Sequence, residues 1–306
     1  MPPRIRKAVF PVAGLGTRIL PATKSIPKEM LPVVDKPLIQ YAVEEAAASG
    51  IEEFIFVTGR GKAALEDHFD RAYELEAMLA ERGKVEAVEA VRSCVPSAGR
   101  IAYTRQPKPL GLGHAVHCAR ALVGEEPFAV LLPDDLVLSK TPCLRQLIDV
   151  YEETGGNVVA VVEVPADQVR RYGILVPGPD DGRRVEVRGL VEKPEPAAAP
   201  SRLAVIGRYL LSPGVMASLA QAGAGHGGEI QLTDALAARI GHEPLHGLRF
   251  EGRRIDCGDA IGLLQANLAV ALERADLGEA VRAAIEDELS LGLGRSARAS
   301  ERRRGG

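Results

Sequence analysis

The sequence predicts an α/β fold: a doubly wound, mainly parallel mixed sheet flanked by helices, with a small β-rich portion beside it. The apolar run from Ala8 to Ala13 is typical of a buried strand. Helical spacing over Leu38–Ser49 ends at Gly50, and Glu53–Thr58 is a second apolar run. Strand, helix and strand at this spacing indicate a parallel sheet whose ligands bind at the carboxyl ends of its strands.

Composition restricts the class of protein. The chain has 306 residues, and its 46% hydrophobic content is enough for a substantial core. A net charge of −3 argues against general attraction to nucleic acid or membranes, so any anion site must be a local cluster. Four cysteines without C-x-x-C spacing are typical of buried thiols in a reducing compartment. Without a secretory signal or a membrane-spanning run, we expect a cytoplasmic protein.

The segment after the first strand is the most informative part of the chain. It is rich in glycine, cations and proline: Gly14, Gly16, Thr17, Arg18, Pro21, Lys24, Pro27, Lys28 and Pro32. Glycines let backbone N–H groups approach an anion closely, and nearby cations hold its charge. Prolines at this density prevent the segment from forming a helix. The sequence therefore predicts a loop that wraps a nucleoside triphosphate.

Two other phosphate-binding motifs fit this loop poorly. The dinucleotide fingerprint G-x-G-x-x-G requires a third glycine where Ile19 stands, and an acidic residue about 20 residues further on at a strand end, which is missing. This disfavours a nicotinamide-dependent oxidoreductase. A Walker loop, G-x-x-x-x-G-K-[ST], occurs nowhere in the chain. A lone G-x-G is often only a tight surface turn, but the cations and prolines behind it favour an anion site.

Three stretches of this region carry a family resemblance. GLGTR at 14–18, LPATKSIPKEMLPVVDKP at 20–37 and IQYAVEEA at 39–46 are similar to bacterial UDP-glucose pyrophosphorylases, or UTP–glucose-1-phosphate uridylyltransferases. These belong to the nucleotidyltransferase family of sugar-nucleotide pyrophosphorylases. The resemblance covers roughly Arg6 to Ala271. It implies the Rossmann-like nucleotide-diphospho-sugar transferase fold, in which the β-rich portion binds the sugar.

A second loop follows the predicted strand Arg100–Arg105. Gln106 offers both an acceptor and donors, which suits the edge of a pyrimidine ring. The family pattern in RQPKPLGLGHA implies that Gln106 and Gly111 recognise uracil. His114 reads as a residue near the start of the next helix, because the implied reaction needs no general base. The resemblance places the other nucleotide contacts at Ala13, Gly14, Gly16 and Thr17.

Acidic residues follow the buried strand predicted at Phe128–Leu132. A carboxylate at the carboxyl end of such a strand is a natural Mg²⁺ ligand. Asp134 and Asp135 are consecutive, so their side chains point opposite ways on an extended chain and at most one holds the metal directly. The family pattern assigns that role to Asp134 and leaves Asp135 as a loop or helix-capping residue. It places a second metal-binding aspartate at Asp256, within D-x-G.

The third motif is implied to bind the sugar. RYGIL at 171–175 and EVRGLVEKP at 186–194 read as short strands. By the resemblance, Gly173 lines the sugar pocket, Glu192 bonds sugar hydroxyls and Lys193 meets the sugar phosphate. A carboxylate suits hydroxyl donors, and an ammonium suits a phosphate oxygen. The Gly-rich segment with GEIQLTD at 228–234 is expected to form structure around this pocket.

The implied reaction is the direct, in-line attack of a glucose 1-phosphate oxygen on the α-phosphorus of UTP. The products are UDP-glucose and pyrophosphate. Arg18 and Lys28 would hold the triphosphate, Lys193 the incoming phosphate, and Asp134 with Asp256 the Mg²⁺. A sister enzyme that transfers thymidylyl or cytidylyl groups is the main alternative. A non-catalytic regulatory paralogue is disfavoured, because such proteins usually lose loop glycines or cations that this chain retains.

The expected organisation is one nucleotidyltransferase domain over 1–275, with a nucleotide half at about 1–165 and a sugar and phosphate half at about 166–275. A helical extension at 276–293 follows, and then an arginine-rich tail at 294–306 that we expect to be disordered. The resemblance implies a homodimer or homotetramer. No nucleic-acid or membrane partner is expected.

Overall fold

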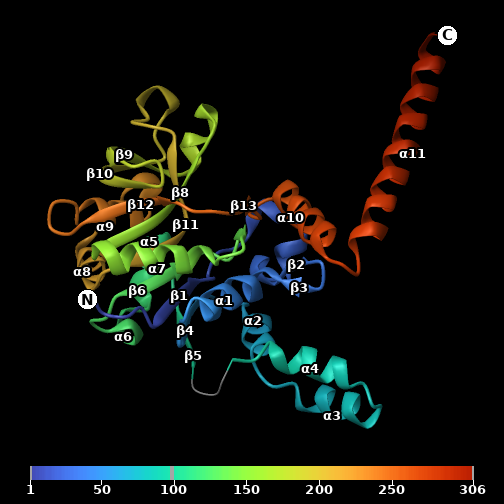
Figure 1. Ribbon diagram of the computed structural model, residues 1–306, viewed down its shortest axis with the longest axis horizontal. Helices are drawn as coiled ribbons and strands as arrows, with labels where there is room; N and C mark the ends of the chain where they lie inside the picture. The colour runs from blue at the N-terminus through green and yellow to red at the C-terminus, as the bar shows by residue number, and fades with distance from the viewer. Residues whose placement is uncertain (1, 97–99, 305–306) are drawn as a thin grey trace.

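The computed structural model describes residues 2–96 and 100–304, and a nine-stranded sheet is its central feature (Figure 1). The strand order is β5-β4-β1-β6-β11-β8-β12-β10-β9. The strands are β1 (Lys7–Pro11), β4 (Glu53–Thr58), β5 (Ile101–Arg105), β6 (Phe128–Leu131), β8 (Asn157–Glu163), β9 (Gly173–Asp180), β10 (Arg184–Glu192), β11 (Leu203–Leu211) and β12 (Leu245–Arg249). The predicted α/β class is confirmed.

Strand direction changes across the sheet. β1 pairs in parallel with both β4 and β6, and β5 extends this parallel part at the edge. β11 is antiparallel to β6 and to β8, and it joins the parallel part to the rest of the sheet. β9 and β10 form an antiparallel hairpin, which a short turn can close without a crossover helix. The predicted nucleotide and sugar halves therefore share one continuous sheet.

Helices cover both faces of the sheet. They are α1 (Leu38–Ala48), α2 (Ala63–His68), α3 (Tyr73–Glu81), α4 (Val85–Ser93), α5 (Leu112–Cys118), α6 (Arg120–Val123), α7 (Cys143–Thr154), α8 (Pro213–Gln221), α9 (Leu232–Ala237), α10 (Ala260–Glu273) and α11 (Gly278–Arg304). α1 and α7 pack on one face of the sheet, and α5, α8 and α9 on the other. In β1, Ala8 and Phe10 face the first core and Val9 the second, which explains its unbroken apolar run.

A short second sheet corrects the prediction for Asp135. β7 (Asp135–Leu138) pairs antiparallel with β13 (Arg253–Asp256), so Asp135 begins a strand and is neither a loop residue nor a helix cap. Its buried carboxylate accepts the Gly207 N–H at 2.7 Å and pairs with Arg254. These partners compensate the charge, and they allow an aspartate to occupy a buried strand position.

The chain ends in α11, which extends away from the body of the protein (Figure 1). This helix continues to Arg304, through most of the segment for which the composition predicted a disordered tail. Alanine, glutamate and arginine favour helix formation. Among the helices of the described residues, none has the length and apolar character needed to cross a membrane.

Candidate functional site

One cavity collects predicted site residues from distant parts of the chain. Its volume is ≈ 470 Å³, and its lining includes Arg18, Asp134, Gly173, Glu192, Lys193 and Asp256. These come from the loop after β1, the end of β6, the β9–β10 hairpin and the end of β13. The cavity therefore lies where the parallel part of the sheet meets the β9–β10 hairpin, beside the carboxyl ends of the strands.

The loop after β1 has the irregular form that its prolines predict. It contains only short 3₁₀ turns, η1 (Thr17–Ile19), η2 (Ala22–Lys24) and η3 (Lys28–Met30). Gly16 has φ 67°, and a Cβ there would lie 3.2 Å from the side chains of both Lys28 and Thr23. The left-handed backbone and these close side chains therefore favour glycine at this position. Arg18 is the residue of this loop that lines the cavity, and the predicted nucleotide contacts Ala13, Gly14, Gly16 and Thr17 are not among the lining residues.

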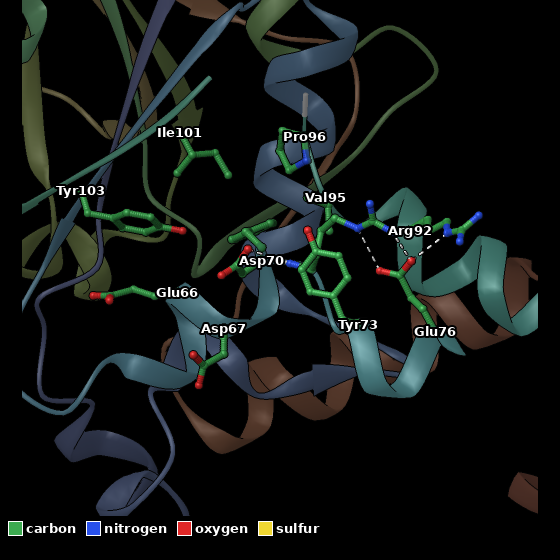
Figure 2. A pocket seen from close by; sticks show the side chains of 12 residues that line it. Glu66, Asp67, Asp70, Tyr73, Glu76, Arg92, Val95, Pro96, Ile101 and Tyr103 are labelled. Atoms are coloured by element: carbon green, nitrogen blue, oxygen red, sulfur yellow. Dashed lines mark hydrogen bonds and ion pairs between the residues drawn. The ribbon is translucent and has the colours of Figure 1, made fainter. Parts of the chain in front are cut away.

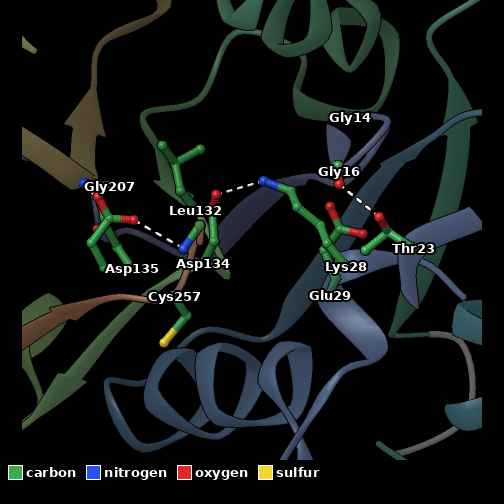
Figure 3. Close-up of polar contacts among 12 residues, drawn as sticks. Gly14, Gly16, Thr23, Lys28, Glu29, Leu132, Asp134, Asp135, Gly207 and Cys257 are labelled. Carbon is green, nitrogen blue, oxygen red and sulfur yellow. Dashed lines mark hydrogen bonds and ion pairs between the residues drawn. The ribbon is translucent and has the colours of Figure 1, made fainter. Parts of the chain in front are cut away.

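Lys28 connects this loop to the end of β6. Its Nζ donates to the Asp134 carboxylate at 2.5 Å (Figure 3). Burial raises the pKa of Asp134, but the Lys28 ammonium outweighs burial and holds that pKa below its usual value. Burial lowers the pKa of Lys28, but Asp134 and Glu29 together more than reverse this effect. The pair is therefore ionised, with Asp134 facing the loop and Asp135 facing Gly207.

Asp256 lies beside Asp134. The Cys257 N–H donates to the Asp134 carbonyl oxygen at 2.7 Å, which joins the ends of β13 and β6. The Asp256 carboxylate accepts from Arg171 at 3.1 Å and from the Gly258 N–H at 3.0 Å. Carboxylate oxygens are the hard donors that Mg²⁺ prefers. No group of three or more ligand-type side chains occurs within the described residues, so substrate oxygens would have to complete the coordination of a metal here.

Arg18 reaches the same place from the opposite side of the cavity. A Cβ added to Gly258 would lie 2.9 Å from the Arg18 Nη2 and 2.9 Å from an Asp256 oxygen. The Arg18 guanidinium therefore lies next to the turn that carries Asp256. A cation from the loop after β1 and the carboxylates of β6 and β13 thus surround one volume.

The opposite wall contains the predicted sugar contacts. Gly173 begins β9, and a Cβ there would lie 2.8 Å from Thr233 Oγ1 and 3.3 Å from Glu192 Oε2, so glycine keeps this wall open. Lys193 Nζ lies 3.3 Å from Glu192 Oε1. Lys193 has φ 47°, a left-handed conformation that disfavours side chains by about 1–2 kcal/mol. Backbone strain of this kind gathers at functional sites.

The predicted uracil loop lies at the edge of the cavity. Gln106 Nε2 donates to the Gly111 carbonyl oxygen at 3.0 Å and lies 3.0 Å from His114 Nδ1. Gly111 has φ 97°, and a Cβ there would lie 2.7 Å from the Glu229 Cβ. Gln106 and Gly111 do not line the cavity, although the next residue, Leu112, does.

Sequence reasoning missed several charged residues of the site. Arg254 pairs with Asp135, donates to the Tyr172 hydroxyl at 3.0 Å and lies 3.4 Å from Asp256. Burial lowers the pKa of Arg254, but Asp135, the hydrogen bond to Tyr172 and Asp256 raise it above its usual value. Lys62, before α2, donates to the Gly14 carbonyl oxygen at 2.8 Å. Neither residue belongs to a motif, so only the folded chain shows its position.

A larger cavity of ≈ 1010 Å³ lies between α2–α4 and β5 (Figure 2). Its lining includes Glu66, Asp70 and Tyr103, while Glu76 is held between Arg71 and Arg92. None of the predicted site residues lines it. The convergence of opposite charges, and not the cavity volume, marks the smaller cavity as the candidate site.

Comparisons with known proteins identify the family to which this chain is similar. The family model described as nucleotidyl transferase matches residues 7–273. UTP–glucose-1-phosphate uridylyltransferase of Komagataeibacter xylinus is 56% identical over 257 residues, covering 84% of this chain and 90% of that protein. The UTP-bound UGPase from Acinetobacter baumannii has a TM-score of 0.84 and 44% identity, covering 92% of this chain and 99% of that one. A UDP-glucose pyrophosphorylase complexed with UDP-glucose has a TM-score of 0.81 and 42% identity, covering 89% of this chain and 100% of that one.

Proposed function

The chain belongs to the nucleotidyl transferase family, and from that premise we propose that it transfers the uridylyl group of UTP to glucose 1-phosphate. The products are UDP-glucose and pyrophosphate. The resemblance inferred from the loop motifs is thereby confirmed at the level of the family. The observation that supports the reaction best is the single cavity in which Arg18 and Lys193 face Asp134 and Asp256.

The reaction sets an electrostatic problem more than a proton-transfer problem. The attacking phosphate oxygen is already ionised near neutral pH, so no general base is needed. Two polyanions must be brought together, and charge must be stabilised on the transferring and leaving oxygens. Positioning can supply roughly 7–11 kcal/mol, and one well-aimed charge donor about 3–4 kcal/mol. A few well-placed cations can therefore supply transition-state stabilisation of the required magnitude.

We assign the cations by their position. Arg18 and Lys28, on the loop after β1, hold the triphosphate and the leaving pyrophosphate. Lys193, at the end of β10, orients the phosphate of the sugar substrate. Lys28 and Lys193 form ion pairs with Asp134 and Glu192. These ion pairs hold the cations in place before the substrates arrive.

The remaining contacts concern the base and the sugar. Glu192 accepts hydrogen bonds from sugar hydroxyls, and Gly173 leaves the space that the sugar ring needs. Gln106 and Gly111 bind the uracil edge from the rim of the cavity. The nucleotide loop contributes its remaining contacts through Ala13, Gly14, Gly16 and Thr17.

A divalent cation, Mg²⁺, fits the same cavity. Asp134 and Asp256 would hold it, because both carboxylates line the cavity and are now neutralised by Lys28 and Arg171. When bound, the ion would supply Lewis-acid neutralisation of phosphate charge. Asp135 is not proposed as a ligand, since its oxygens are occupied by Gly207 and Arg254.

Product formation from UTP, dTTP and CTP with glucose 1-phosphate tests the proposal. We expect UDP-glucose to form fastest from UTP, and a chelator to abolish turnover. Faster reaction with dTTP or CTP would instead indicate the sister activity. UTP binding without turnover would indicate a regulatory paralogue. In single-turnover measurements, losses under about tenfold in all of Lys28→Ala, Asp134→Ala and Lys193→Ala would overturn the assigned roles.

We also propose the predicted domain boundaries, a homodimer or homotetramer, and a cytoplasmic location. The cysteines Cys94, Cys118, Cys143 and Cys257 are free thiols, which suits a reducing compartment. Light scattering coupled to size-exclusion chromatography gives the oligomeric state directly. A monomer at micromolar concentration would contradict that part of the proposal.

A further inference from the structure

Two side chains outside the proposed catalytic set donate hydrogen bonds to backbone carbonyl groups of the nucleotide loop, Gly14–Lys28. We propose that Lys62 and Thr23 are positioning residues that aim the backbone N–H groups of the loop at the triphosphate. This inference rests on the proposed function, because it concerns the same subsite. Lys62 and Thr23 act through the backbone, and neither is assigned a contact with the substrate.

Lys62 lies at the start of α2 and points into the protein. Its Nζ donates to the Gly14 carbonyl oxygen at 2.8 Å and to Glu29 Oε2 at 2.8 Å. The side chains of Lys62 and Glu29 are only 6% and 0% exposed. An ammonium buried in this way cannot also reach a phosphate in the cavity. Its effect on the ligand must pass through Gly14.

The consequence follows from peptide geometry. In a trans peptide, the C=O and the following N–H point in opposite directions. Lys62 holds the Gly14 carbonyl toward the interior, so the Leu15 N–H points the other way. Leu15 is itself 70% exposed, which places this peptide at the open side of the loop.

Thr23 does the same for a carbonyl two residues further along the loop, that of Gly16. Its hydroxyl donates to the Gly16 carbonyl oxygen at 2.7 Å (Figure 3). This contact turns the Thr17 N–H away from Thr23. Gly16 is left-handed, and N–H groups that follow one another through such a turn can form a concave anion site.

The N–H groups so arranged are available to a ligand. Within the part of the chain that the structure describes, the N–H groups of Leu15 and Thr17 donate to no protein acceptor. The ion pair of Lys62 also fixes Glu29, which follows Lys28 in the chain. One buried lysine therefore sets the position of the loop backbone relative to the Lys28 cation.

The first experiment removes the Thr23 hydroxyl. Thr23→Val keeps the shape of the side chain, and we expect the KM for UTP to rise about tenfold. The KM for glucose 1-phosphate should change less than twofold, and Thr23→Ser should retain most of the affinity for UTP. Thr154→Val is the matched control, since its hydroxyl donates to the Val150 carbonyl oxygen at 2.8 Å in α7, outside the cavity lining.

The second experiment removes Lys62 without leaving a buried charge. Lys62→Met combined with Glu29→Gln removes both charges, so the fold should survive. We expect the same selective rise in the KM for UTP. The matched control is Lys7→Met with Glu126→Gln. Lys7 also donates to a carbonyl oxygen, that of Val123 at 3.0 Å, and pairs with Glu126 at 2.8 Å, but it lies at the opposite end of β1.

Equilibrium binding of UTP and of inorganic tripolyphosphate separates the possible outcomes. Weaker binding of both probes in the Thr23 and Lys62 variants, but not in the two controls, supports the positioning role. Equal changes in the controls, or parallel rises in both KM values, would overturn it. If the parent binds tripolyphosphate in a Thr23-dependent way but forms no UDP-glucose, the proposed function fails and the positioning role stands. Unchanged UTP kinetics in an active Thr23→Val enzyme would overturn only the positioning role.

Discussion

The Cys257 N–H donates to the Asp134 carbonyl oxygen at 2.7 Å. Through this bond and the pairing of Asp256 with Asp135 in register, β13 is fixed to the end of β6 and to β7. The two carboxylates proposed to hold a metal are therefore carried by strand ends rather than by a free loop. Their separation is set by backbone hydrogen bonds, which are less adaptable than side-chain contacts.

Substitution of the adjacent aspartates should separate catalysis from stability. Asp134→Asn should lower turnover at least a hundredfold, because one aimed charge is worth about 3–4 kcal/mol. The fold should be affected less than in the Asp135 variant, because the Lys28 ammonium keeps the nearby Glu29 as a partial counter-charge. Asp135→Ala should lower the free energy of unfolding by about 3 kcal/mol, since it leaves the largely buried Arg254 with only the more distant Asp256 as its counter-charge. Urea denaturation and turnover on the same samples give both values.

A large stability loss in Asp134→Asn, with Asp135→Ala stable and inactive, would reverse the two assignments. Magnesium titration followed by thermal denaturation adds a readout independent of turnover. We expect Mg²⁺ to raise the Tm of the parent in the presence of UTP and to leave the Tm of Asp134→Asn nearly unchanged.

Much of the parallel half of the fold could be predicted, because its strands β1, β4 and β6 are buried on both faces. Glu53–Thr58 is a strand with the predicted bounds, and its run of apolar residues has no competing helical spacing. β7 was missed for the opposite reason. It begins with Asp135, a residue type depleted in strands, and the partners that permit this lie on β11 and β13. No local pattern carries that information.

The same distinction applies to the candidate site. Glycine and cation spacing is local, so the loop at Gly14–Lys28 could be singled out from the sequence. Lys62 could not, because a lysine before a short helix is usually a solvated surface residue. Its burial depends on Glu29 and on the Gly14 carbonyl, which are distant in the chain.

Removing one partner of the buried ion pair between Glu45 and Arg208 should destabilise the fold, whereas replacing both partners together should cost much less. Arg208 is 2% exposed and donates to Glu45 from Nη2 at 2.8 Å, which ties α1 to β11. Glu45→Gln should lower the free energy of unfolding by about 3–5 kcal/mol, because a buried guanidinium loses its counter-charge. Urea denaturation at neutral pH measures the change.

The double variant Glu45→Gln with Arg208→Met should recover most of that loss. The Leu132 and Gly207 carbonyl oxygens lose Arg208 but keep the Asp135 and Leu132 N–H groups as donors. Additive losses in the two single variants and the double variant would show that the ion pair does not couple α1 to β11.

The free energy of unfolding should depend on pH at low pH, through the protonation of Glu76. Hydrogen bonds and attraction from Arg71 and Arg92 lower the pKa of Glu76 from 4.5 to about 2. A carboxyl group whose pKa is lower in the folded state stabilises the fold above its unfolded pKa, and it loses this contribution as the pH falls toward about 2. Urea midpoints of the parent and Glu76→Gln should therefore differ by a constant amount from pH 7 to about 5 and converge below that. Glu74→Gln, on the exposed face of α3, is the control, and its urea midpoint should match that of the parent at every pH. If the difference in urea midpoint between the parent and Glu76→Gln instead grew as the pH fell, the assignment to Glu76 would be contradicted.

The left-handed backbone of Lys193 should allow its chemistry to be removed without loss of stability. Asparagine tolerates φ 47° better than lysine does, so Lys193→Asn should change the free energy of unfolding by less than about 0.5 kcal/mol. Turnover should fall by about two to three orders of magnitude, because the phosphate loses its charge partner. Val34 provides the control, since it has φ 63° and lies outside the cavity lining. Val34→Asn should raise the free energy of unfolding by about 1 kcal/mol and leave turnover unchanged. A stable and fully active Lys193→Asn enzyme would remove Lys193 from the proposed phosphate site.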